Sequence, residues 1–178
     1  MLASIWLRLS GEPERRLRTL IEALATQHGT VPFEPHLTVC GIPRLTAAMS
    51  DAAAAYVRPD RALPFTLRRT GISPSTVTPF KALVIDFENT SELTAFRDNL
   101  RRITGGNEPE PPHISLLYPI DGQGHVLDWA SDEARLRGIA SQCAARIDTG
   151  AFVLGRPVIV TTDGDWKKIR SWSIVREL

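Results

Sequence analysis

The sequence is poor in cysteine and in net charge. Only two cysteines, Cys40 and Cys143, stand among its 178 residues, and neither lies in a CxxC or mixed Cys/His spacing that would bind zinc. The net charge of +1 argues against an extended basic surface of the kind that holds DNA. These shortages argue against a structural zinc site and against DNA as a partner.

Long apolar runs are also missing. The N-terminal stretch MLASIWLRLS is too short to span a membrane, and no signal-peptide cleavage pattern follows a basic start. We therefore expect a first strand here, no membrane partner, and a cytoplasmic location with reduced thiols.

What the chain does contain is an ordinary globular composition, with 43% apolar and 23% charged residues. Its length suits one domain, or two small lobes that share a core. Alternating or helical apolar spacing, bounded by Gly, Pro and capping residues, predicts the elements. The predicted helices are 11–29, 45–56, 89–106 and 128–145; the predicted strands are 4–10, 36–41, 64–75, 79–88 and 113–118, with three closing strands between 146 and 178.

The order of these elements suggests an internal duplication. A strand, a helix and a two-stranded hairpin follow one another over 36–88, and the same order is predicted again over 113–163. The mixture of helices and hairpins predicts an α+β fold.

One short pattern occurs at the start of both copies. The chain has Pro-His-Leu-Thr-Val at 35–39 and Pro-His-Ile-Ser-Leu at 112–116. Side chains two apart on a strand share a face, so His36 lies with Thr38, and His113 lies with Ser115. The residues between them are apolar and would face the core. If the two copies are related by a twofold axis, both pairs line one cleft.

Two histidines and two hydroxyls suit phosphoryl chemistry. Histidine titrates near neutral pH, so one imidazole can remove a proton from the attacking oxygen while the other protonates the leaving oxygen. The hydroxyls can donate hydrogen bonds to the non-bridging phosphate oxygens. A phosphodiester needs these groups, and this set supplies them without a metal ion or cofactor. The alternative is that two strands merely share a packing habit.

The twin motif resembles that of the two-histidine (2H) phosphoesterase superfamily, whose members carry H-x-[ST]-x twice. The stretches SIW, EPHLTV, PFKAL and PPHISLLY are most similar to cyclic phosphodiesterases of the plant and yeast type. The resemblance covers the whole chain in outline and is sharp only in these motifs. It implies that residues 1–178 form a single bilobal domain, with antiparallel sheets lining a central cleft and helices outside.

The resemblance also implies an activity. Enzymes of this type open nucleoside 2′,3′-cyclic phosphates to 2′-phosphates, and ADP-ribose 1″,2″-cyclic phosphate to ADP-ribose 1″-phosphate, without metal. Carried onto this chain, His36 and His113 would be the acid/base pair, and Thr38 and Ser115 would hold the phosphate. The expected partner is a small cyclic phosphate nucleotide or ADP-ribose derivative.

Two aromatic residues are further candidates for binding substrate. Trp6 lies on the strand face opposite Ile5 and Leu7, where it is either a platform for a base or part of the core. Tyr118 matches the family's aromatic residue after the second motif. Strict alternation places it on the face of Ile114, so it is core unless Pro119 ends the strand and redirects it.

Two alternatives to a small-molecule hydrolase stay open. One is an enzyme of the same superfamily that acts on RNA 3′ ends, as a 2′,5′ RNA ligase or phosphodiesterase. The other is a module that binds nucleotide or RNA without catalysis. Turnover separates the two classes, because binding alone does not require a histidine in each motif.

Overall fold

The computed structural model describes residues 2–57, 63–75, 81–107, 110–147, 150–162 and 165–178. Every pairing between its strands is antiparallel. The strands are β1 (Ala3–Leu9), β2 (His36–Ile42), β3 (Phe65–Pro74), β4 (Leu83–Phe87), β5 (His113–Leu117), β6 (Ala151–Thr161) and β7 (Ser173–Glu177). The α-helices are α1 (Glu12–His28), α2 (Ala47–Tyr56), α3 (Ser91–Thr104) and α4 (Glu133–Ala144).

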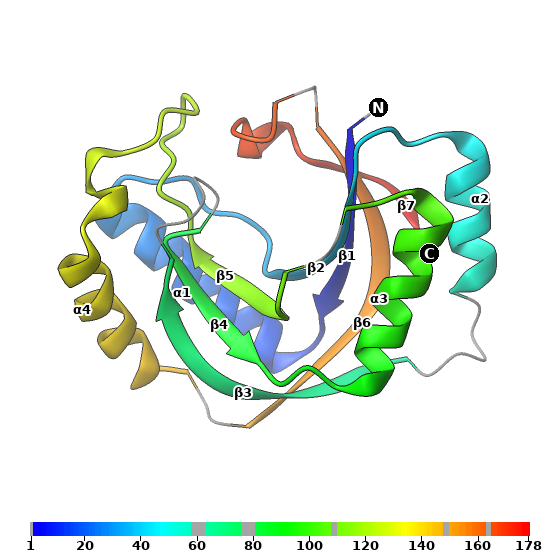
Figure 1. The fold of residues 1–178 in the computed structure, drawn as a ribbon. Helices are drawn as coiled ribbons and strands as arrows, with labels where there is room; N and C mark the ends of the chain where they lie inside the picture. Colours follow the sequence, from blue (N-terminus) through cyan, green and yellow to red (C-terminus); the bar gives the residue numbers. More distant parts are fainter. Residues whose placement is uncertain (1, 58–62, 76–80, 108–109, 148–149, 163–164) are drawn as a thin grey trace.

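The sheet is continuous around a closed circuit. Its order is β1-β2-β5-β4-β3-β6-β7, and β6 also pairs with β1. The helices lie outside the curved sheet, with α2 and α3 on one side and α4 on the other (Figure 1). The predicted α+β class, with an antiparallel sheet lining a cleft and helices outside, is confirmed. No helix in the described part of the chain is long and apolar enough to cross a membrane.

The repeat exists, but its predicted boundaries are wrong. The first copy is β1-α1-β2-α2-β3 and the second is β4-α3-β5-α4-β6, so each begins one strand and one helix earlier than expected. Pairing agrees with this division. The central neighbours β2 and β5 are flanked by β1 and β4, which are flanked in turn by β6 and β3. Each Pro-His motif therefore begins the middle strand of its copy.

Equivalent helices of the two copies end alike. Gly29 follows α1 and Gly105 follows α3, both in the left-handed conformation that favours glycine, with φ of 71° and 61°. Each glycine N–H donates to the carbonyl four residues earlier. Helix α1 packs on β5, and α3 packs on β2, so each helix covers the motif strand of the other copy.

Two predicted details at the C-terminal end are wrong. The range 146–163 contains one strand and not a hairpin, because β6 continues through Gly155 while it pairs with β3 and then with β1. Residues 166–172 contain a turn and a short 3₁₀ helix (Ile169–Ser171), leaving β7 as the last strand. The predicted helix 128–145 is interrupted by Asp132, whose side chain caps α4 by accepting from the Arg135 N–H.

Candidate active site

The two motif strands are neighbours in the sheet. Leu37 pairs with Ile114, the one pair that joins β2 to β5. Extending this antiparallel register by one residue each way sets His36 opposite Ser115 and Thr38 opposite His113. Residues opposite one another share a face, so both histidines and both hydroxyls lie on one face. The sequence-based prediction that the two motifs meet in one place is thus consistent with the strand order.

The outer strands extend this array. Trp6 of β1 pairs with Thr38, and Asp86 of β4 pairs with His113. One row across the sheet is therefore Trp6-Thr38-His113-Asp86, and the next is Arg8-His36-Ser115-Val84. The row between them, Leu7-Leu37-Ile114-Ile85, points to the opposite face and is completely buried in the core.

Both histidines are held by the same hydrogen bond. Nδ1 of His36 lies 2.6 Å from the carbonyl oxygen of Glu34, and Nδ1 of His113 lies 2.8 Å from that of Pro111. A carbonyl only accepts, so Nδ1 carries the proton and Nε2 keeps a free lone pair.

The proline of each motif explains this geometry. A residue that precedes proline is confined to extended backbone, which limits the orientation of its carbonyl group. Here the preceding residues are Glu34 and Pro111, whose carbonyls accept from the two imidazoles. The repeated Pro-His pair thus selects the same tautomer twice.

His36 lies among aromatic rings. Its imidazole stacks on Trp6 with ring centroids 3.6 Å apart and planes 11° apart, and the Trp172 ring meets it edge-on at 6.2 Å. Only 6% of His36 is exposed. Burial lowers its pKa to about 4, the Glu34 hydrogen bond opposes that shift, and nearby His113 adds to it.

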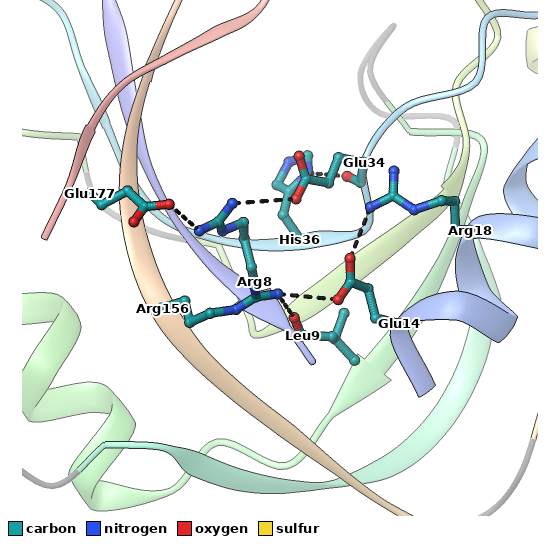
Figure 2. A network of polar contacts seen from close by, with 8 residues as sticks. All are labelled: Arg8, Leu9, Glu14, Arg18, Glu34, His36, Arg156 and Glu177. Carbon is teal, nitrogen blue, oxygen red and sulfur yellow. Dashed lines mark hydrogen bonds and ion pairs between the residues drawn. The ribbon is translucent and has the colours of Figure 1, made fainter. Parts of the chain in front are cut away.

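Ion pairs connect the segment just before His36 to strand β1 and strand β7. The Glu34 carboxylate lies 3.9 Å from the guanidinium of Arg8, which bonds Glu177 at 2.8 Å (Figure 2). Glu34 therefore contacts Arg8 through its side chain and His36 through its backbone. The network continues nearby, where Arg156 donates to the carbonyl oxygen of Leu9 and to Glu14.

His113 lies among charges. Burial lowers its pKa, the Pro111 hydrogen bond opposes that shift, Lys81 and Arg97 lower it further, and Asp86 raises it. Asp86 also accepts a hydrogen bond from the Ser73 hydroxyl. The two imidazoles thus have the same local hydrogen bond but different surroundings.

A β-bulge separates Thr38 from Cys40. Thr38 pairs with Trp6 while Cys40 pairs with the adjacent residue Ile5, so Val39 is the extra residue. The Cys40 sulfur consequently points to α3, 3.8 Å from the Thr104 hydroxyl. Cys40 shares the parity of His36 and Thr38 in the sequence, but the bulge removes it from their face of the sheet.

Tyr118 lies just past the end of β5 and is 5% exposed. Its ring stacks on Phe33 at 3.8 Å and meets Trp172 edge-on at 5.8 Å. Burial raises the pKa of its hydroxyl, and a hydrogen bond with the Ser115 side chain opposes that shift. Strand β5 ends before Tyr118, so strict alternation does not govern it, and the residue is both buried and in contact with Trp172, which meets His36 edge-on.

A cavity of about 410 Å³ opens beside the first motif. Four aromatic rings form one wall, and Thr38, Ser4, Asn107 and Glu110 supply polar groups; the described lining includes no lysine or arginine. The lining is Leu2, Ala3, Ser4, Trp6, His36, Thr38, Gly41, Ile42, Pro43, Asn107, Glu110, Tyr118, Trp166 and Trp172. A larger hollow of about 510 Å³ lies elsewhere, between α1 and the start of β6, and contains none of the motif residues.

The sequence-based prediction assigned no role to Lys81 and Arg97, and treated Trp172 only as a weaker candidate than Trp6 for an aromatic platform. Trp172 contacts His36, Trp6 and Tyr118, and donates from its indole N–H to the Trp166 carbonyl. Lys81 forms an ion pair with Glu110. Their placement depends on closure of the sheet, which no local pattern encodes. Among the described residues, no group of three or more His, Cys, Asp or Glu could hold a metal ion.

Comparison with known proteins identifies the fold. No family model and no curated protein matches the chain. Among solved structures, Escherichia coli LigT complexed with phosphate has a TM-score of 0.58 at 14% identity, covering 99% of this chain and 94% of that one. A structure described as a phosphoesterase gives 0.58 at 16% identity, covering 99% and 95%, and LigT complexed with NADP+ gives 0.57 at 15% identity, covering 98% and 94%.

The chain has the LigT fold. The fold that the resemblance to 2H phosphoesterases implied is therefore confirmed. Similarity at this identity places the strands and helices and does not assign a substrate.

Proposed function

We propose that residues 1–178 act as a bilobal, metal-independent cyclic phosphodiesterase that opens a ribose cyclic phosphate by acid/base catalysis with His36 and His113. The observation that carries the proposal is the shared hydrogen bond, which leaves Nε2 of both imidazoles free of a backbone partner. Two such nitrogens on adjacent strands suit an in-line displacement, in which one proton is taken and one is given.

The proposed reaction balances without any further reagent. One imidazole accepts a proton from water, whose oxygen attacks phosphorus, and the bond between phosphorus and one ribose oxygen breaks. The other imidazole, protonated at the start, gives its proton to that leaving oxygen. The hydroxyls of Thr38 and Ser115 donate hydrogen bonds to the non-bridging oxygens. The negative charge of the phosphate raises the pKa of the imidazole beside it. This favours a state in which one histidine is protonated and the other is neutral, although burial lowers the pKa of both.

The cavity supports a nucleotide or ADP-ribose derivative as the substrate. In its aromatic wall the partly exposed rings of Trp166 and Trp172 can stack on a base, while Trp6 and Tyr118 are buried beside them, and its polar groups can accept and donate hydrogen bonds. Structures of LigT complexed with phosphate, NADP+, ATP and 3′-AMP make a nucleotide ligand reasonable for this fold. A described lining without lysine or arginine favours a small substrate over RNA 3′ ends, because long RNA is held mainly by phosphate contacts.

The decisive experiment is hydrolysis of adenosine 2′,3′-cyclic phosphate with EDTA present, with the 2′- and 3′-phosphate products resolved. We expect the 2′-phosphate, and a fall in kcat of about 10²–10⁴-fold in both His36→Ala and His113→Ala. His125→Ala is the matched control, because His125 is an exposed loop residue paired with Asp121 outside the cavity lining.

Three outcomes would change the assignment. Turnover that disappears with EDTA would overturn metal independence. No turnover by the folded protein would move the substrate to ADP-ribose cyclic phosphate or to RNA 3′ ends, which are tested next. Binding of nucleotide without turnover of any of these would favour a non-catalytic module.

A further inference from the structure

Arg97 is a buried arginine beside the site, with 4% of its surface exposed. Its Nε lies 3.4 Å from the carbonyl oxygen of Val39, and its Nη2 lies 3.4 Å from that of Thr38 and 2.5 Å from that of Glu110. One guanidinium therefore contacts the backbone of β2 within the first motif and the backbone just before the second.

The Glu110 contact leads directly to His113. The next carbonyl along the chain, that of Pro111, accepts the Nδ1 proton of His113. Arg97 thus holds the peptide that precedes the acceptor for the imidazole. Its other contacts hold the backbone at Thr38, which lies opposite His113 in the extended register.

The fold does not require an arginine at this position. When the two copies are aligned on the glycines that end α1 and α3, Arg97 falls on Ile21, because each residue lies eight positions before its glycine. Ile21 is fully buried, like the flanking Leu17 and Leu24 of its helix. An apolar side chain therefore fills the same place in the first copy.

Burying a guanidinium has a cost that an isoleucine avoids. Burial lowers the pKa of Arg97 to about 10, which reflects the loss of water around the charge. A buried charge is costly unless hydrogen bonds compensate it, whereas an apolar side chain has no such cost. An arginine kept at such a position needs another explanation, and its three carbonyl contacts supply one.

We propose that Arg97 is a positioning residue, which ties the first motif strand to the segment before the second motif and so fixes His113 relative to Thr38. The proposal rests on the proposed function. Arg97 is absent from the cavity lining, so it acts through the backbone of other residues rather than on substrate. Its planar fork suits contacts to two chain segments at once, which a single ammonium group cannot reproduce.

The test replaces Arg97 by the residue that occupies its place in the first copy. In Arg97→Ile we expect kcat for adenosine 2′,3′-cyclic phosphate to fall about 10–100-fold, with KM changed far less, since outer partners of catalytic groups act on orientation. The tautomer is read by ¹⁵N NMR of the imidazoles. We expect wild-type His113 to carry its proton on Nδ1 and the variant to show a mixture, while His36 stays unchanged.

Two further variants separate the possible causes. Arg102→Ile alters an exposed arginine of the same helix and should leave kcat and both tautomers unchanged. Arg97→Lys keeps a positive charge and loses the fork, so we expect it to resemble Arg97→Ile in kcat. It also serves as the test protein if Arg97→Ile does not fold.

Wild-type kcat with an unchanged His113 tautomer in Arg97→Ile would overturn the proposal. Full activity in Arg97→Lys would also overturn it, because charge alone would then suffice. If the wild-type protein hydrolyses no cyclic phosphate, the proposed function fails, while the NMR comparison still tests the orientation of His113.

Discussion

The two Pro-His motifs place the same side chains in the same hydrogen bond and then surround them differently. His36 is stacked on Trp6 and flanked by Trp172, whereas His113 is near Lys81, Arg97 and Asp86. Burial lowers the pKa of both imidazoles, but neighbouring charges modify that shift mainly at His113. A duplicated motif thus gives the chain two copies of one geometry, and the surroundings make the two copies chemically distinct.

The largest expected effect comes from breaking the aromatic side. Trp6→Ala should reduce the free energy of unfolding by about 3–5 kcal/mol, because it removes a buried ring that stacks on His36. Lys81→Met on the charged side should change it by less than about 1 kcal/mol, since its ion-pair partner Glu110 is half exposed. Urea denaturation of both variants at pH 7 measures the two changes in the free energy of unfolding. Equal losses would show that the aromatic and the charged surroundings matter equally for stability.

The burial of His36 should also make the free energy of unfolding depend on pH. The pKa of His36 is about 4 when folded and 6.5 when unfolded, so between these values the unfolded state binds more protons. The stabilisation that comes from keeping His36 neutral is fully present above pH 6.5. It is lost as the pH falls to about 4, which lowers the free energy of unfolding by about 3 kcal/mol. His113 contributes with the same sign, since its pKa is also lowered.

Denaturation curves measured from pH 7.5 to 4 test this contribution of His36. Wild type should lose about 3 kcal/mol more than His36→Gln over this range. Parallel curves for the two proteins would show that His36 is not desolvated as its burial implies.

The hydroxyls of Thr38 and Ser115 allow the two motifs to be compared in catalysis. We expect Thr38→Val and Ser115→Ala each to lower kcat/KM about 10–150-fold, the value of a hydrogen bond to a charged oxygen. Thr38→Ser and Ser115→Thr keep the hydroxyl and should stay near wild type. Wild-type rates in the variants without a hydroxyl would assign the phosphate to other donors.

The smallest expected effect concerns the charges around His113. Asp86 raises the pKa of His113 and Lys81 lowers it, so Asp86→Asn should move that pKa down and Lys81→Met should move it up. NMR titration of the two imidazoles measures both shifts. Equal movement of His36 would contradict the view that these charges act on one histidine.

The part of the site that the sequence predicts is the part encoded locally. Alternation within a strand sets His36 beside Thr38 and His113 beside Ser115, and the repeated tetrapeptide indicates that they meet. The repeat was predicted with the wrong boundaries because the expected hairpin in the second copy does not form: β6 runs unbroken through Gly155. The prediction therefore compared the real β3–β4 hairpin with a second hairpin that does not exist.

Other features depend on long-range contacts. Arg97 lies on the same helical stripe as Leu93 and Leu100, where periodicity alone treats a charged residue as the edge of a buried face. Trp172 reaches His36 only because β7 pairs with β6, which itself pairs with β1. The bulge at Val39 likewise depends on the partner strand, so alternation along β2 does not place Cys40.

That bulge has a consequence for chemical durability. By turning the Cys40 sulfur toward Thr104, it keeps a thiol away from the cavity, and burial raises the pKa of that thiol, which disfavours the reactive thiolate. The described residues that line the cavity contain no sulfur. A site built from imidazoles, hydroxyls and aromatic rings offers peroxide no low-pKa thiol to oxidise, so its activity should persist under oxidative conditions that inactivate thiol-dependent enzymes.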